Sequence, residues 1–279
     1  MISIPIVQVD AFTDRPFGGN PAAVVLDAGG LDVAQMQAIA KEMNLSETAF
    51  LSPSESGHTD FRLRWFTPGG EVTFCGHATI ATGHALHEAG RFIGPRISFD
   101  TSGGVLGLAR EGQVFWLEPE PRRIRTYTDP VAPILAAMNL EPDDLADWAK
   151  PALSTERDLM LPCKRLDVLG RAVSGAELAR VGDSESIRGF ALVTFETVEP
   201  TSKTHTRFYA PHLGIVEDPV TGSLHASLAV WLRGLGLAPE HFTAEQGDLM
   251  GRPGRLEIET KGPRVGGRAV TVLKGELFI

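Results

Sequence analysis

Three titratable residues of this sequence stand where proton chemistry is possible. Glu47 lies between apolar neighbours, His77 stands two residues after Cys75, and Asp218 opens a long stretch without charged residues. Carboxylates and imidazoles act as general acids and bases when burial or neighbouring charges move their pKa values toward the working pH. We therefore predict Glu47, His77 and Asp218 as catalytic residues.

The surroundings of Glu47 favour a role beyond that of a surface charge. A glutamate that follows a helix is usually solvated, but this one has the apolar neighbours Leu45, Ala49 and Phe50. Removal of a carboxylate from water raises its pKa. We expect this desolvation to bring the pKa of Glu47 into the range that suits proton transfer.

Cys75 and Asp218 each have a structural interpretation as well. A cysteine in an apolar run is commonly a buried packing residue, and an aspartate ahead of a helix commonly accepts hydrogen bonds from its first turn. For Asp218 the two roles are compatible. For Cys75 the sequence leaves packing and ligand contact open.

Two helices without a charged face are predicted at the centre of the fold. No Asp, Glu, Lys or Arg occurs in residues 72–87 or in residues 219–232. A helix that is apolar on all sides is a buried helix. His77, His84 and His87 recur at helical spacing in the first run, but no carboxylate at ligand spacing accompanies His77, so we expect no metal site.

These two runs belong to an internal repeat. Arg64-Trp-Phe-Thr-Pro68 ends seven residues before Cys75, and Arg207-Phe-Tyr-Ala-Pro211 ends seven residues before Asp218, so the copies lie 143 residues apart. A repeat of this length indicates one structural unit used twice. By this alignment Cys75 and Asp218 occupy corresponding places at the starts of the two buried helices.

The repeat predicts an α/β (α+β) fold of two pseudo-symmetric domains, each a curved mixed sheet wrapped around one central buried helix. We place the boundary in the Pro- and Arg-rich stretch 118–123, which gives domains of residues 1–118 and 119–279. The last strand, residues 268–279, has no counterpart in the first half. It is therefore a candidate for pairing with the first domain.

Shorter patterns predict the elements around these helices. Strands are expected at residues 2–10 and 22–26, as an opening hairpin, and a helix at residues 33–43, where Asp32 and Gln35 form a capping box. Ser174 is expected to open a second helix of this kind in the other half.

The starts of the two buried helices are expected to face each other across the domain interface and to hold an anion. Clefts between domains commonly bind small ligands, and the free N–H groups at a helix start attract negative charge. Gly76, Gly222 and Ser223 would let a ligand approach the backbone. We therefore predict a small substrate with a carboxylate or similar group.

Composition excludes several classes of protein. The chain has 279 residues and a net charge of −9, which argues against a nucleic-acid partner. Its apolar stretches are shorter than the roughly 20 residues that cross a membrane, and its two cysteines lack CxxC spacing, which fits a reducing compartment. Nucleotide-binding and nucleophile-elbow motifs are absent. We predict a cytoplasmic enzyme with neither a membrane nor a nucleic-acid partner, and proton chemistry without a cofactor.

Four motifs together resemble the phenazine-biosynthesis isomerase family, the PhzF-like proteins with a diaminopimelate-epimerase-like fold. They are Phe17-Gly-Gly-Asn-Pro21, Asn44-Leu-Ser-Glu47, Phe74-Cys-Gly-His-Ala-Thr79 and Glu217-Asp-Pro-Val-Thr-Gly-Ser223. The resemblance covers essentially the whole chain. It implies a homodimer without a cofactor, and a glutamate that takes a proton from one ring carbon of trans-2,3-dihydro-3-hydroxyanthranilate and returns it at another.

Carried over by motif, that glutamate is Glu47, with His77 and Asp218 beside it. The residues predicted to bind substrate are Asn20, Ser46, Cys75, Gly76, Thr221, Gly222 and Ser223. The related epimerases and racemases use one cysteine in each half, whereas here the second place is Asp218. This difference argues against a mechanism with two thiols.

Three functions remain in view. The first is a cofactor-independent isomerase that shifts a proton between carbons of a small carboxylate through Glu47. The second is a two-base epimerase or racemase of an amino or hydroxy acid, with Cys75 and Asp218 on opposite faces of a stereocentre. The third is a protein that binds a small carboxylate without reaction.

Overall fold

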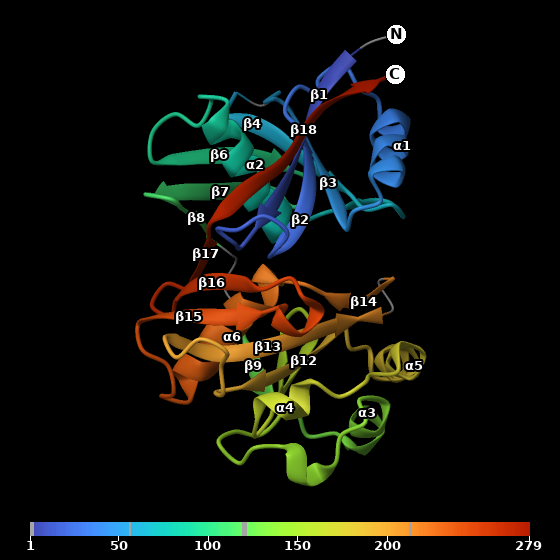
Figure 1. The fold of residues 1–279 in the computed structure, drawn as a ribbon, viewed down its shortest axis with the longest axis vertical. Helices are drawn as coiled ribbons and strands as arrows, with labels where there is room; N and C mark the ends of the chain where they lie inside the picture. Colours follow the sequence, from blue (N-terminus) through green and yellow to red (C-terminus); the bar gives the residue numbers. More distant parts are fainter. Residues whose placement is uncertain (1–2, 56, 119–121, 212–213) are drawn as a thin grey trace. The chain divides into compact units, whose positions relative to one another are not determined.

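The computed structural model describes residues 3–55, 57–118, 122–211 and 214–279 (Figure 1). It divides into two compact units: unit 1 contains Met1–Glu118 and Gly266–Ile279, and unit 2 contains Pro119–Val265. Part of the predicted boundary stretch 118–123, namely 119–121, lies outside the described residues. Within the described ranges, no helix is both long enough and apolar enough to span a membrane.

Unit 1 is a mixed sheet with two helices, α1 (Val33–Met43) and α2 (Gly76–Glu88). Its strands are β1 (Ser3–Ala11), β2 (Asn20–Val25), β3 (Glu47–Pro53), β4 (Phe61–Phe66), β5 (Glu71–Val72), β6 (Arg96–Thr101), β7 (Gly104–Glu111), β8 (Val114–Leu117) and β18 (Ala269–Phe278). They pair in the order β18-β1-β2-β3-β4-β6-β7-β8, and short β5 also pairs with β4. The pairs β2–β3 and β4–β6 are parallel and the others antiparallel.

Helix α2 is the centre of unit 1. It packs against strands from both ends of the sheet, β18, β1, β2 and β3 on one side and β7 and β8 on the other, so the sheet curves around it. Buried residues occur on every face of the helix, from His77 to Leu86. The buried helix predicted from the charge-free run 72–87 is confirmed.

The last strand belongs to unit 1. β18 pairs antiparallel with β1, with Ser3 opposite Phe278, so the first and last described segments of the chain lie side by side (Figure 1). On its other edge β1 pairs with β2 and forms the opening hairpin.

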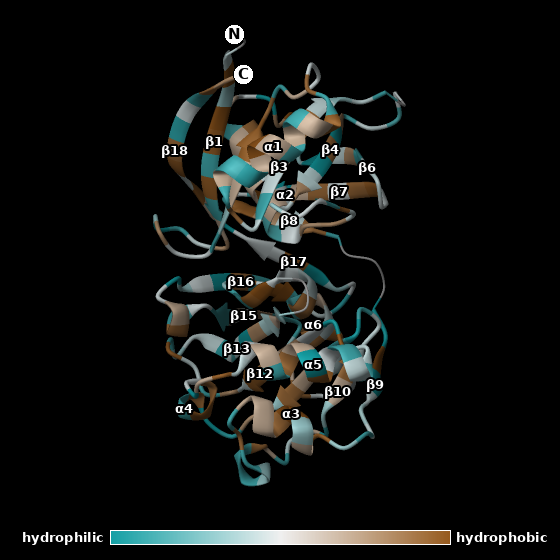
Figure 2. Ribbon diagram, turned by 90° about the vertical axis from the view of Figure 1, so that its right-hand side faces the viewer, coloured by the Kyte–Doolittle hydropathy of each residue, from teal (hydrophilic) through white to brown (hydrophobic). Residues whose placement is uncertain are grey.

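Helix α1 shows how local sequence sets the position of the next strand. Asp32 and Gln35 form the predicted capping box, and the helix ends at Asn44 in the left-handed conformation. The helix buries Met36 and Ile39, and its exposed residues include both the apolar Val33 and the charged Lys41, so the helix is of mixed hydropathy (Figure 2). Because the left-handed residue reverses the chain sharply, β3 begins only three residues later.

Unit 2 has the same kinds of element. Its strands are β9 (Ile124–Thr126), β10 (Ala152–Ser154), β11 (Asp158–Pro162), β12 (Gly189–Thr194), β13 (Ser202–Ala210), β14 (Ile215–Asp218), β15 (His241–Gln246), β16 (Gly254–Glu259) and β17 (Arg264–Gly267), the last of which leads into unit 1. Its helices are α3 (Ala132–Ala137), α4 (Leu166–Leu169), α5 (Gly175–Glu185) and α6 (Gly222–Gly234), with 3-10 turns at Pro142–Asp144 and Asp248–Met250. The strands pair in the order β9-β10-β11-β12-β13-β15-β16, with β14 also on β13.

The repeat predicted from sequence appears as matching elements. Helices α1 and α5 both have 11 residues and both end in a left-handed residue, and α2 and α6 both have 13. Ser174 opens α5 by accepting a hydrogen bond from the Glu177 amide, as predicted. In each unit the strand after the first of these helices is parallel to the strand before it: β3 to β2, and β12 to β11.

Candidate active site

The first part of the site is the start of β3. Glu47 is its first residue and lies opposite Ala22 of the parallel strand β2. Ser46 precedes it, and the Ser46 hydroxyl lies 3.5 Å from the amide oxygen of Asn20, a fully buried residue at the start of β2. The structure therefore brings together the predicted residues Asn20, Ser46 and Glu47.

The second part is the start of α2. Cys75 is the N-cap residue, but no side chain caps the helix there, and Gly76 and His77 form its first turn. A Cβ atom at Gly76 would lie 3.2 Å from a methyl group of Leu117, so glycine allows close packing at this point. The first turn of the helix thus packs closely against β8, and its residue His77 also reaches Glu47 at the start of β3.

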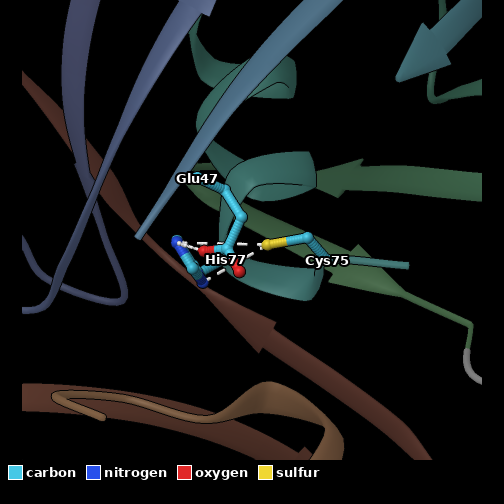
Figure 3. A group of neighbouring side chains, drawn as sticks. All are labelled: Glu47, Cys75 and His77. Carbon is cyan, nitrogen blue, oxygen red and sulfur yellow. Dashed lines mark hydrogen bonds and ion pairs between the residues drawn. The ribbon is translucent and has the colours of Figure 1, made fainter. Parts of the chain in front are cut away.

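Glu47, Cys75 and His77 form one buried cluster (Figure 3). The Glu47 Oε2 atom lies 3.2 Å from His77 Nε2, with side-chain exposures of only 12% and 8%. The Cys75 sulfur lies 3.5 Å from His77 Nδ1. The Glu47–His77 contact is an ion pair rather than a well-aligned hydrogen bond, so among the described residues none donates a hydrogen bond to Glu47 Oε2.

The cluster separates charge between Glu47 and His77. Burial acts to raise the pKa of Glu47, but the charge of His77, with contacts from Cys75 and Ser46, outweighs it and lowers that pKa below 4.5. Burial acts to lower the pKa of His77, but Cys75 and Glu47 outweigh it and raise that pKa well above 6.5. Near neutral pH the pair is therefore a carboxylate and an imidazolium.

Cys75 stays a neutral thiol in this environment. Burial, reinforced by the adjacent carboxylate of Glu47, raises the pKa of Cys75 to about 11. A thiolate is the form that attacks electrophiles or abstracts protons. The geometry thus makes Cys75 a neighbour of the ion pair and a poor base.

These findings correct the expectation for Glu47. The apolar neighbours in sequence predicted a raised pKa, and the structure shows a lowered one. Desolvation is present as expected and is the largest single contribution, but the charge of His77 together with the contacts from His77, Cys75 and Ser46 outweighs it. His77 lies 30 residues further along the chain, so sequence neighbours alone do not reveal its effect.

The cluster also has the composition of a metal-binding site. One ligand atom each from Glu47, Cys75 and His77 lies within 4.8 Å of the others, so a carboxylate does accompany His77, although not at helical spacing in sequence. Metal binding requires a thiolate and a neutral imidazole. The raised pKa values of Cys75 and His77 oppose both conditions.

The start of α6 is the corresponding place in unit 2. Thr221 is its N-cap residue, and the Thr221 hydroxyl donates a 2.6 Å hydrogen bond to the carboxylate of Asp218 at the end of β14. Gly222 and Ser223 form the first turn. The structure brings the four predicted residues Asp218, Thr221, Gly222 and Ser223 together.

The alignment of Cys75 with Asp218 is wrong by three residues. Both helices have 13 residues, and their N-caps are Cys75 and Thr221, which lie 146 residues apart rather than 143. In each helix the fourth residue donates to the carbonyl of the N-cap residue: Thr79 to Cys75, and His225 to Thr221. The connection between β13 and α6 is longer than that between β4 and α2. The residue of unit 2 that corresponds to Cys75 is therefore Thr221 rather than Asp218.

The counterpart of Glu47 carries no side chain. β3 begins four residues after the last residue of α1, and β12 begins four residues after the last residue of α5. The first residue of β12 is Gly189, opposite Asp158 of the parallel strand β11. The acid–base cluster of unit 1 therefore has no repeated copy in unit 2.

Sequence reasoning missed two residues at the start of α6. Gln246 at the end of β15 accepts from the Thr221 amide and donates to the Asp218 carbonyl, at 3.0 and 2.8 Å. Arg188 donates to the Ser223 hydroxyl at 3.2 Å. Gln246 has no signal in the sequence, and the 143-residue repeat places Gly189 opposite Ser46; only the matching strand starts of β3 and β12, 142 residues apart, place Arg188 there.

Comparison with known proteins places this chain in a family. The family model described as phenazine biosynthesis-like protein matches residues 9–275. An uncharacterized isomerase of Pseudomonas aeruginosa is 36% identical over 100% of both chains.

Solved structures agree. A PhzF-family phenazine biosynthesis protein of Bacillus anthracis has a TM-score of 0.91 at 27% identity, over 100% of both chains. A probable proline racemase of Agrobacterium radiobacter has a TM-score of 0.66 at 13% identity, over 99% of this chain and 93% of its own, which shows a shared fold alone. The fold class predicted from sequence, mixed α/β of the diaminopimelate-epimerase-like type, is confirmed.

Proposed function

This chain is an enzyme of the phenazine biosynthesis-like family of isomerases, and from that premise we propose that Glu47 moves a proton between two carbons of a small carboxylate substrate without a cofactor. The observation that carries the proposal is the environment of one carboxylate oxygen, Glu47 Oε2. Glu47 Oε2 is buried 3.2 Å from His77 Nε2, and the charge of His77 lowers the pKa of this carboxyl, which favours its ionised form. Such an oxygen is available to accept a proton.

His77 supports both halves of this proton transfer. As an imidazolium it keeps Glu47 deprotonated before the reaction. Once Glu47 has taken a proton, the pair loses its charge balance, so the proton is readily returned to another carbon. We also propose that His77 stabilises negative charge that develops on the substrate.

The lowered pKa of Glu47 limits the substrate. A carboxylate of low pKa is a weak base, and proton abstraction by a weak base is efficient only when the C–H bond is acidic. Conjugation with an unsaturated system or an amino group makes a C–H bond more acidic. We therefore propose an unsaturated or amino-bearing small carboxylate as the substrate class.

The residues at the start of α6 complete the proposal. Asp218 is proposed as the third catalytic residue, holding an amino or hydroxyl group of the substrate. Gly222 and Ser223 are proposed to bind the substrate through the first-turn N–H groups and the hydroxyl, because no side chain caps this helix. The homodimer implied by the resemblance and the cytoplasmic location predicted from the cysteine spacing remain predictions.

A two-base epimerase is the second candidate, because Cys75 lies in the cluster. That mechanism needs two bases of comparable strength. The pKa of Cys75 is raised to about 11, and the corresponding N-cap in unit 2 is the threonine Thr221. Both observations favour the single-base isomerase. A protein that binds a carboxylate without reaction is the third candidate, and a turnover measurement separates it from the other two.

The test is turnover of trans-2,3-dihydro-3-hydroxyanthranilate, followed by proton NMR, in wild type and the Glu47→Gln variant. We expect Glu47→Gln to lower the rate about a hundredfold or more, as removal of a general base does. Glu42→Gln, the same change at an exposed residue of α1, should leave the rate unchanged. Wild-type activity in a folded Glu47→Gln protein would contradict the proposal.

A further inference from the structure

We infer that Arg188 is a positioning residue that fixes the Ser223 hydroxyl as a hydrogen-bond donor to the substrate carboxylate. The inference rests on the proposed function, because a small carboxylate is the substrate class proposed above. It concerns unit 2 alone and assigns a role to a residue outside the four family motifs.

Asp158 fixes the direction of the Arg188 side chain. The Arg188 Nε and Nη2 atoms donate to the two carboxylate oxygens of Asp158, at 2.9 and 2.5 Å. Asp158 is fully buried, and this two-pronged contact helps to compensate its charge. A planar guanidinium held by two parallel hydrogen bonds has a defined direction.

The same Nη2 atom reaches the start of α6. It donates to Ser223 Oγ at 3.2 Å, in a contact that shares the two Nη2 hydrogens with the nearer oxygens of Asp158 and Glu156. A hydroxyl has two lone pairs and one hydrogen, and a guanidinium can only donate. The contact therefore uses a lone pair of Ser223 and leaves the hydroxyl hydrogen to be donated elsewhere.

The guanidinium acts through the hydroxyl rather than as a free charge. Arg188 Nη2 also lies 3.0 Å from a carboxylate oxygen of Glu156, and Glu156 in turn pairs with Arg122. The positive charge of Arg188 is thus balanced by Asp158 and Glu156. At the start of α6, Arg188 therefore orients and polarises the Ser223 hydroxyl, which makes this hydroxyl suitable for hydrogen bonding to an anion.

The residue after Arg188 is Gly189, which leaves space for these side chains. A Cβ atom at Gly189 would lie 2.1 Å from Cζ of Phe208 and 3.1 Å from an oxygen of Asp158. Glycine therefore leaves room for the Phe208 ring, and the Arg188 guanidinium lies 5.8 Å from the centre of that ring. In the repeat, Arg188 and Gly189 take the places of Ser46 and Glu47, so unit 2 has an anchored cation at the place of Ser46 and no side chain at the place of the proton carrier.

A double-mutant cycle tests the inference. The probe is anthranilate, an unreactive aromatic amino carboxylate, and the readout is its dissociation constant by isothermal titration calorimetry for wild type, Ser223→Ala, Arg188→Lys and the double variant. Lysine keeps the charge but cannot hold Asp158 with a two-pronged contact and reach Ser223 as well. We expect each single variant to weaken binding about tenfold, the loss typical of a hydrogen bond to a charged group.

The decisive comparison is the double variant. If Arg188 acts through the hydroxyl, then Arg188→Lys adds no further loss once Ser223 is alanine. Ser223→Thr, which keeps a hydroxyl, should bind within about twofold of wild type, since only a methyl group is added. Arg171→Lys, which breaks a similar two-pronged contact with Asp144, should bind as wild type does. Asp158→Asn weakens the same anchor without leaving a buried unpaired charge and serves if Arg188→Lys does not fold.

Three results would overturn the inference: additive losses in the double variant, wild-type binding by Arg188→Lys, or no binding of anthranilate by wild type. None of them bears on Glu47, whose role is measured by turnover. Conversely, full turnover by Glu47→Gln would overturn the proposed proton carrier and leave the binding cycle intact. The two failures are therefore distinguishable.

Discussion

Glu47 and His77 form a buried ion pair whose oxygen and nitrogen lie 3.2 Å apart, between the first residue of a strand and the first turn of a central helix. A cation near a helix N-terminus is unfavourable, and a carboxylate there is favourable. His77 is consequently charged because Glu47 is beside it. Each residue therefore sets the protonation state of the other.

Removal of the imidazole should shift the acid limb of the pH–rate profile. With His77 present, the pKa of Glu47 lies below 4.5, so the base stays ionised and active as the pH falls to that lowered pKa. In His77→Asn the desolvation of Glu47 is no longer outweighed, so its pKa should rise and the rate should fall at a higher pH. The measurement is kcat/KM against pH.

The matched control for this prediction is His84→Asn, which changes a histidine of the same helix that pairs with Glu88. It should leave the acid limb in place. An unchanged acid limb in His77→Asn would show that His77 does not hold the pKa of Glu47 down.

Neither cysteine should react in the native protein at neutral pH. Burial raises the pKa of Cys75 to about 11 and that of Cys163 to about 12. We expect iodoacetamide at pH 7.5 to label neither residue in the folded state and both in denaturant, as measured by intact-mass spectrometry. Rapid native labelling of Cys75 would indicate a thiolate and would favour the two-base mechanism.

The link between Gln246 and the start of α6 should matter to stability. Gln246→Leu would leave the Thr221 amide and the Asp218 carbonyl without this partner. The Thr221 amide is buried, and a buried polar group left unsatisfied costs about 1–3 kcal/mol, so we expect the free energy of unfolding in urea to fall by about 1–3 kcal/mol. Gln35→Leu, at the exposed start of α1, should cost about 1 kcal/mol at most. Equal losses in the two variants would mean that Gln246 has no special part in holding α6.

The sequence predicted the elements well where the signals are local. The capping box at Asp32 and Gln35 and the two charge-free helices all depend on residues within a few positions of one another, and all are confirmed. The repeat also predicted that each unit would contain a central helix of one kind.

The predictions were wrong where they depend on residues that lie far apart in the sequence. The pKa of Glu47 is set by His77, which only folding brings beside it. The alignment of Cys75 with Asp218 assumed equal loops, whereas the loop before α6 is longer. Gln246 reaches the start of α6 from β15, more than twenty residues beyond it in sequence, and no pattern near Gln246 indicates this contact.

The most direct test of the central claim follows the hydrogen itself. Wild-type enzyme converts trans-2,3-dihydro-3-hydroxyanthranilate in D₂O, and NMR and mass spectrometry measure how much product from the first turnover retains the original hydrogen. Because one buried carboxylate carries the proton, the account predicts that part of the product keeps it. Product that is fully deuterated from the first turnover would contradict the account and would point to two separate bases.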